Sequence, residues 1–225
     1  MPKYRRAYIN ARLLDPESGL DAVGALYTED GPIKDLGPDL FAEGAPEGVE
    51  VVDCEGACLA PGLIDMRVLL RDPGEEHKEP IASASRAAAS GGLPTMVALP
   101  HSLPVIDRVA GGVYIARLAR GAKGAKVFTY AAATRGLKGE ELTEFGMLQE
   151  YGARGFTDGL KAIASAQVMQ RALSYARSFN RDIIQHPEEP TLGGGAMNGG
   201  ELATRLGLSG CPVVAEVILV ERDIR

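Results

Sequence analysis

The chain has 225 residues, of which 45% are hydrophobic, 24% charged and 5% aromatic. These proportions are those of an ordinary soluble protein, and the length allows one large domain or two small ones. The formal net charge of -6 gives no support for nucleic acid or an anionic membrane surface as a partner.

The three cysteines, Cys54, Cys58 and Cys211, are too few for a disulfide framework. Cys54 and Cys58 alone are a weak zinc signal, and small residues in strands explain them equally well. No apolar segment of signal-peptide length follows the N-terminus, and no apolar span of about 18 residues occurs. We therefore expect the protein in a reducing cytoplasm.

The N-terminal quarter of the chain shows short strand-like runs separated by turn residues. Asp15-Pro16-Glu17-Ser18-Gly19 and Thr28-Glu29-Asp30-Gly31 are typical turn sequences. No helix of convincing length fits here. We predict a small, mostly antiparallel, β-sandwich-like subdomain over residues 1–59. Its predicted strands cover residues 4–14, 21–27, 32–37, 49–54 and 57–60.

From residue 60 the pattern changes to alternating strands and helices, which implies parallel strands joined by right-handed crossovers. About five βα units are visible, whereas a complete (β/α)8 barrel needs about 250 residues. We therefore predict an α/β fold in which residues 60–225 form an incomplete TIM-type barrel. The predicted strands cover residues 63–70, 94–99, 125–133, 153–157 and 182–185. The predicted helices cover residues 81–90, 111–119, 140–151, 164–178, 200–206 and 212–225.

The first strand of this region belongs to a distinctive stretch. Its apolar run from Leu63 to Leu70 follows Pro61-Gly62 and is ended by Asp72-Pro73-Gly74. A short apolar run between such breakers favours a buried strand that leads into a loop.

Several motifs follow one another at a characteristic spacing. They include Pro61-Gly62-Leu63-Ile64-Asp65-Met66, Leu70-Arg71-Asp72-Pro73-Gly74, Glu76-His77-Lys78-Glu79, Gln185-His186-Pro187-Glu188 and Arg205-Leu206-Gly207-Leu208. In this order the chain resembles the N-terminal half of the dihydroorotases, within the cyclic amidohydrolases, over essentially its whole length. The resemblance implies a (β/α)8 barrel, one or two zinc ions at its C-terminal mouth, and opening and closing of dihydroorotate in pyrimidine biosynthesis.

The resemblance also implies two zinc ligands, in a His-x-His pair, at positions that hold Arg67 and Leu69 here. An arginine offers no accessible lone pair and a leucine offers no ligand atom, so this pair is lost. Asp158 and His186 match further metal-contacting positions of the family. A helix-capping aspartate and a structural histidine are the alternatives. A zinc site rebuilt from His101, Asp158 and His186 is another alternative.

Two residues match substrate-binding positions. Arg71 matches the arginine that binds the substrate carboxylate in the family, a task suited to a guanidinium. The alternative is a salt bridge that fixes the loop, to Asp72 or Glu75. His101 stands where the family has a substrate-binding asparagine.

Arg67 suggests a positive hypothesis as well. We expect it to pair with Asp158 and to fill the vacated metal cavity, because a buried carboxylate without a counter-ion is costly. The leading interpretation is a dihydroorotase-like protein that has lost catalysis, with zinc absent or weakly bound. The resemblance implies aspartate transcarbamoylase as a structural partner of such chains.

The alternative is an active zinc-dependent cyclic amidohydrolase completed by segments absent from this chain. Five βα units leave an open sheet edge and apolar helix faces. We therefore expect either a homo-oligomer or a missing C-terminal half.

Overall fold

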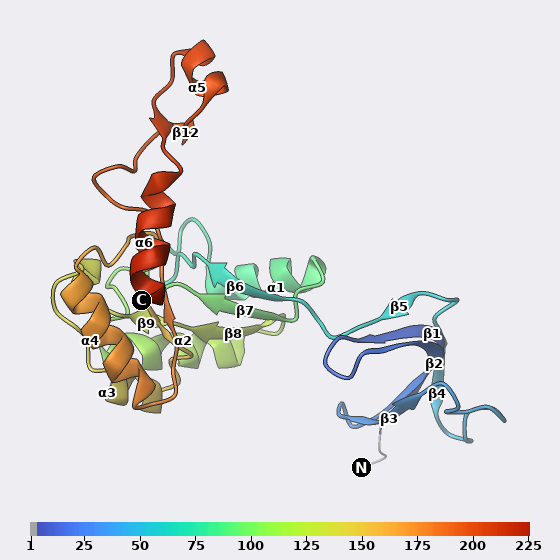
Figure 1. Ribbon diagram of the computed structural model, residues 1–225. Coiled ribbons are helices and arrows are strands. Elements are labelled where there is room, and N and C mark those ends of the chain that lie inside the picture. Colours follow the sequence, from blue (N-terminus) through green and yellow to red (C-terminus); the bar gives the residue numbers. More distant parts are fainter. Residues whose placement is uncertain (1–3) are drawn as a thin grey trace. The chain divides into compact units, whose positions relative to one another are not determined.

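The structure is a computed structural model that describes residues 4–225 (Figure 1). The chain divides into two compact units, Met1–Gly62 and Leu63–Arg225. No helix among the described residues is both long and apolar enough to cross a membrane.

The first unit is a five-stranded sheet built around its first strand. β1 pairs antiparallel with β2, and β2 pairs antiparallel with β3. The antiparallel pairing expected for most of this unit is present in β1, β2 and β3, whereas β4 and β5 both run parallel to β1. Residues 38–49 form the connection between β3 and β4. This connection is long enough for β4 to run parallel to β1. The strands are β1 (Arg5–Asp15), β2 (Leu20–Glu29), β3 (Ile33–Gly37), β4 (Glu50–Asp53) and β5 (Cys58–Leu59).

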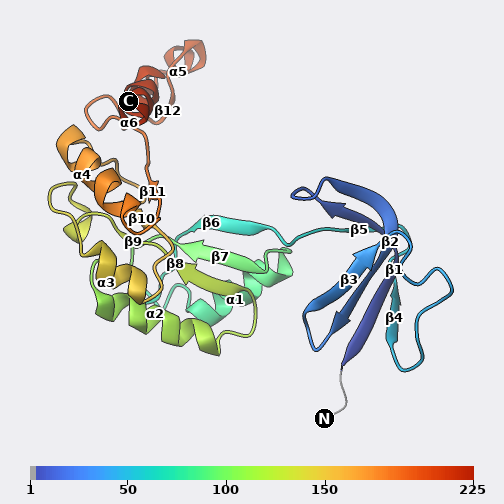
Figure 2. The same ribbon diagram turned by 60° about the horizontal axis from the view of Figure 1, so that its bottom comes forward.

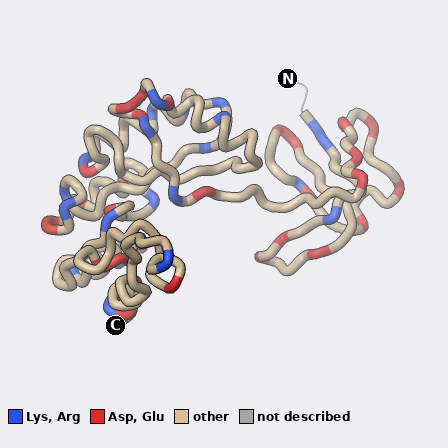
Figure 3. The backbone as a smooth tube through the Cα atoms, turned by 90° about the horizontal axis from the view of Figure 1, so that it is seen from above, with Lys and Arg blue, Asp and Glu red and all other residues tan. Residues whose placement is uncertain are grey.

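The two units differ in charge. Residues 1–62 contain 5 Lys or Arg and 12 Asp or Glu, which gives a formal charge of -7. Residues 63–225 contain 19 and 18, which gives +1. Figure 3 shows the acidic residues spread over the strands and loops of the first unit. The negative charge of the chain therefore belongs to its N-terminal unit.

The second unit is built on parallel strands. Their order is β6-β7-β8 in one sheet and β9-β10-β11 in another, with parallel pairing throughout. Hydrogen bonds at Tyr130 connect the two sheets, because Tyr130 N donates to Ala98 O (2.9 Å) and Ala131 N donates to Gly155 O (3.1 Å). The strands are β6 (Ile64–Val68), β7 (Thr95–Ala98), β8 (Lys126–Thr129), β9 (Ala131–Ala132), β10 (Phe156–Thr157) and β11 (Ile183–Ile184).

Helices separate these strands, as the alternating pattern predicted, except for β8 and β9, between which only Tyr130 lies. Figure 2 shows β6, β7 and β8 side by side, with α1 and α2 along one face of them. The helices are α1 (Ile81–Ser90), α2 (Val109–Gly121), α3 (Phe145–Glu150), α4 (Ala166–Arg177), α5 (Glu201–Leu206) and α6 (Val214–Ile224), with a 3-10 turn η1 at Arg135–Leu137. A short parallel pair, β12 (Met197–Asn198) and β13 (Gly210–Cys211), flanks α5.

The helix bounds follow from local chemistry. α1 has the predicted bounds because Gly91 and Gly92 end it, and Gly92 adopts a left-handed conformation (φ 79°). α3 is half as long as predicted. The preceding residues instead bind the end of β9, since Thr143 N donates to Ala133 O (3.1 Å) and Thr143 Oγ1 donates to Ala132 O (2.6 Å).

The core of this unit lies between the strands and helices. Stacked aromatic rings hold α3 and α4 against β10: Phe145 stacks on Phe156 with ring centroids 3.9 Å apart, and on Tyr175 at 4.8 Å. A second cluster joins α1 and α2 to β7 through Ile81, Met96 and Ile115. These clusters fix the strand ends at which the candidate site lies.

Candidate functional site

Four polar side chains gather where parallel strands end. Arg67 is on β6, His101 follows β7, Asp158 follows β10 and His186 follows β11. We call these four residues the strand-end site. The carboxyl ends of parallel strands are where α/β proteins usually place their chemistry.

Arg67 faces the ends of β10 and β11. Its Nη2 donates to Gly159 O (3.2 Å) and lies 3.2 Å from His186 Nδ1. A guanidinium has donors only, so His186 Nδ1 faces it as the acceptor. His186 Nε2 in turn lies 3.9 Å from Glu188 Oε2. Arg67, His186 and Glu188 thus form a chain of cation, imidazole and carboxylate.

Asp158 is bound by Thr134 rather than by Arg67. The residue is only 1% exposed. Its Oδ1 accepts from Thr134 N (2.9 Å), and its Oδ2 accepts a short hydrogen bond from Thr134 Oγ1. The expected ion pair between Arg67 and Asp158 is therefore wrong: Thr134 already satisfies the buried carboxylate.

Burial raises the pKa of the Asp158 carboxyl, and the hydrogen bonds from Thr134 oppose this effect. Sequence reasoning missed Thr134 altogether. The available signal was its place directly after the small-residue end of the third strand, at the same edge as Asp158.

His101 lies against the backbone of Gly159. Its Nε2 accepts a long bond from Leu160 N (3.5 Å). Burial, with the nearby charges of Lys161 and Arg67, lowers the pKa of His101 and favours the neutral ring. Gly159 has φ 64°, and a Cβ on it would lie 2.1 Å from His101 Cε1. Only glycine therefore fits at this contact.

These residues do not fit a zinc ion. The Nδ1 atom of His186 faces the Arg67 guanidinium, and each oxygen of Asp158 accepts a hydrogen bond from Thr134. Leu69 packs with the cluster of Val97, Leu99 and Tyr130. Across residues 4–225 no three His, Cys, Asp or Glu side chains are grouped so as to hold a metal. A zinc site rebuilt from His101, Asp158 and His186 is therefore not formed.

Arg71 binds within its own loop. Its Nη1 lies 3.1 Å from Glu75 Oε2, and Lys78 binds the other oxygen of this carboxylate. This is one of the two salt bridges considered as the alternative to substrate binding. Asp72 is buried instead, and it accepts from Ile81 N at the start of α1 (3.4 Å). Neither contact tests a role of Arg71 toward a substrate.

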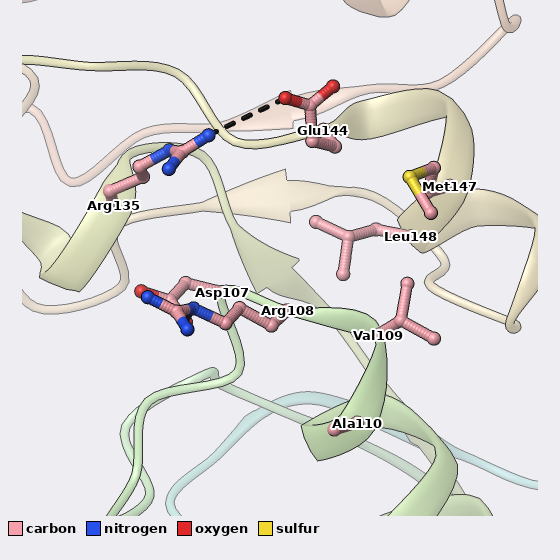
Figure 4. Close-up of a pocket in the computed structure, with 8 residues that line it drawn as sticks. All are labelled: Asp107, Arg108, Val109, Ala110, Arg135, Glu144, Met147 and Leu148. Carbon is pink, nitrogen blue, oxygen red and sulfur yellow. Dashed lines mark hydrogen bonds and ion pairs between the residues drawn. The ribbon is translucent and has the colours of Figure 1, made fainter.

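A hollow of about 340 Å³ lies between the starts of α2 and α3 (Figure 4). Its charged groups are paired. Arg135 Nη2 lies 3.5 Å from Glu144 Oε1, Asp107 Oδ2 accepts from Gly136 N (3.0 Å), and Arg108 Nε lies 3.9 Å from Asp107 Oδ1. Balanced charges and an apolar floor that includes Leu148 give this hollow no preference for one sign of ligand.

The mixed α/β fold is shared with solved hydantoinase structures. L-Hydantoinase (dihydropyrimidinase) from Arthrobacter aurescens matches with a TM-score of 0.74, covering 97% of this chain and 49% of that chain at 18% identity. D-Hydantoinase (dihydropyrimidinase) from Thermus sp. matches with a TM-score of 0.58, covering 96% of this chain and 48% of that chain at 20% identity. At these identities the likeness concerns the fold alone.

The sequence then fixes the family. Residues 56–225 match the family model described as Dihydro-orotase-like, and the chain belongs to this family. It is 43% identical over 223 residues to a dihydroorotase from Wolbachia sp. subsp. Brugia malayi, covering 98% of this chain and 50% of that protein. It is 44% identical over 216 residues to one from Pelobacter propionicus, covering 96% and 50%. The resemblance drawn from the motifs is confirmed, and the chain spans about half the length of these curated relatives.

Proposed function

We propose that this chain is a dihydroorotase-like protein of pyrimidine biosynthesis whose strand-end site no longer performs zinc-dependent hydrolysis. On this proposal residues 60–225 are the first part of an amidohydrolase barrel. Zinc is absent or weakly bound, and the chain serves as a structural partner of aspartate transcarbamoylase.

One observation carries the proposal. Arg67 Nη2 lies 3.2 Å from His186 Nδ1, so a guanidinium stands beside the histidine that matches a metal-contacting position of the family. Hydrolysis of a cyclic amide at neutral pH needs an activated hydroxide, which zinc supplies by lowering the pKa of its bound water to about 7. A guanidinium beside this histidine supplies positive charge but has no open coordination position.

Metal analysis and an activity assay together test this proposal. The purified chain is dialysed against zinc, its metal content is measured, and ring opening of dihydroorotate is followed by ultraviolet absorbance. We expect less than stoichiometric zinc and no turnover above buffer. One zinc per chain together with turnover would defeat the proposal.

The proposed partner is tested separately with purified proteins. We expect the chain to co-elute with the catalytic subunit of aspartate transcarbamoylase in size-exclusion chromatography with light scattering. Separate elution at micromolar concentrations would leave the loss of zinc chemistry standing and remove the partner.

A second candidate is an active zinc-dependent cyclic amidohydrolase completed by segments absent from this chain. The half-length coverage of the relatives favours it, since further ligands would lie on later strands. The apolar exposure of β6 and α6 also supports completion: Ile64 is 57% exposed, Met66 62% and Ile224 80%. Further β/α units or a second copy would cover these side chains.

Reconstitution separates this candidate from the first. The C-terminal half of a curated relative is added to the chain in the presence of zinc. Turnover of dihydroorotate by the mixture would support the second candidate, whereas an inactive complex supports the first.

A further inference from the structure

A second, larger cleft lies along the edge of β8, and none of the residues of the strand-end site lines it. It has a volume of about 710 Å³ and is lined by α2, by β8 and by the segment from the end of α3 to Arg154. Small-molecule sites typically occupy about 300–1,000 Å³. All of these elements belong to consecutive β/α units of this chain. The cleft is therefore not a gap left where the relatives have further units.

The cleft is basic within an acidic protein. Arg120, Lys126 and Arg154 line it, against the single carboxylate of Glu150. Within residues 4–225 none of the three cations forms an ion pair. The hollow of Figure 4 is different, because its arginines are paired with carboxylates.

The sequence around the cleft reinforces this imbalance. From Arg108 to Gly139 the chain contains 7 Lys or Arg and no Asp or Glu. The N-terminal unit, by contrast, carries a charge of -7 from 5 basic and 12 acidic residues. A concave surface lined by one sign of charge attracts ligands of the opposite sign.

The rest of the lining is apolar and aromatic. Val113 and Tyr151 are 43% and 49% exposed, and Phe128 carries the Arg154 guanidinium 4.2 Å from its ring centroid. A planar ring of a ligand can therefore stack on the Tyr151 ring and on the planar guanidinium of Arg154. An anionic group of the ligand can form charge-assisted hydrogen bonds with Arg120 and Lys126.

We propose that this cleft binds a small anion that carries a planar aromatic ring, with a nucleoside monophosphate as the chemical type. The ring lies against Tyr151 and Arg154, and the phosphate is held by Arg120 and Lys126. This site is independent of the zinc question, because it shares no residue with the strand-end site.

Isothermal titration of the full chain with AMP and, separately, with UMP tests the proposal. Adenosine and inorganic phosphate are titrated as the two halves of the ligand. We expect one nucleotide per chain, bound at least about tenfold more tightly than either half, because ring and charge contribute separately. Binding should weaken as salt is raised, since the contacts are ionic.

Matched variants decide whether the binding is specific to the cleft. Arg120→Ala and Lys126→Ala should each weaken binding at least about fivefold, as loss of one charge-assisted contact predicts. Lys123→Ala removes a charge from the same basic run outside the cleft lining, and it should change affinity less than about twofold. Equal losses in Lys123→Ala and Arg120→Ala would show diffuse charge attraction and overturn the site.

A variant without a charge change completes the test. Gly112 lines the cleft, and a Cβ on it would meet no atom within 4 Å. Gly112→Leu adds helix propensity to α2 and fills the cleft, so a folded variant should lose nucleotide binding. Unchanged binding in Gly112→Leu, or no binding of either nucleotide to the wild type at millimolar concentration, would overturn the proposal.

Discussion

Replacing Arg67 with methionine removes the guanidinium that connects β6 to the ends of β10 and β11. The unbranched stem of the side chain is retained. One nitrogen, Nη2, makes both contacts, to Gly159 O and to His186 Nδ1, each at 3.2 Å. Hydrogen bonds to charged groups contribute about 1.5–3 kcal/mol each. Arg67 is exposed, so solvent competes for its donors. We expect Arg67→Met to lower the free energy of unfolding by about 1–2 kcal/mol in total.

Urea unfolding followed by far-ultraviolet circular dichroism measures this loss, provided that the m-value is unchanged. Arg71→Met is the matched control, since Arg71 makes a partly exposed ion pair with Glu75 at 3.1 Å within one loop. That variant should lose only about 0–1 kcal/mol. If Arg67→Met were as stable as Arg71→Met, the connection between the strands would contribute nothing and our reasoning would be refuted.

Three further substitutions probe the same region. Asp158→Asn removes a carboxyl whose pKa is raised by burial. The contribution of Asp158 is therefore complete below about pH 4 and is lost as pH rises through the raised pKa, so wild type should lose stability relative to the variant with rising pH in urea titrations. Gly159→Ala places a methyl group 2.1 Å from His101 Cε1 at a positive φ, and should cost about 2 kcal/mol or more and shift the His101 ring resonances. Phe156→Ala removes a fully buried ring stacked 3.9 Å from Phe145, and should cost about 3–5 kcal/mol in thermal or urea unfolding. A pH-independent difference for Asp158→Asn, an undisturbed His101 in Gly159→Ala, or a loss under about 1 kcal/mol for Phe156→Ala would each contradict the packing described.

The alternation of strands and helices was predictable because local signals and tertiary packing agree there. The bounds of α1 came out as expected, since Gly91-Gly92 ends the helix whatever surrounds it. The helix predicted over residues 140–151 was too long, since α3 covers only Phe145–Glu150. Thr143 binds the end of β9 through its backbone and hydroxyl, and this tertiary contact outweighs the helix propensity of the residues before Phe145.

The site was predictable in its positions but not in its contacts. Asp158 and His186 were expected directly after predicted strands and Arg67 within the first of them, and the structure places them so. Charge alone suggested that Arg67 would pair with Asp158. The partner of Asp158 is instead Thr134, 24 positions earlier in the chain, and that of Arg67 is His186, 119 positions later. A side chain as long as arginine reaches several acceptors, so its choice depends on which of them is already satisfied.

Zinc titration of the metal-free chain and of the double variant Arg67→His, Leu69→His tests the central claim most directly. The claim is that Arg67 and Leu69 are what exclude zinc from this site. It predicts no zinc binding by the wild type at micromolar concentration, and up to one zinc per chain in the variant, which regains two imidazole ligands beside His186. Stoichiometric zinc in the wild type, with Arg67 and Leu69 in place, would contradict the account.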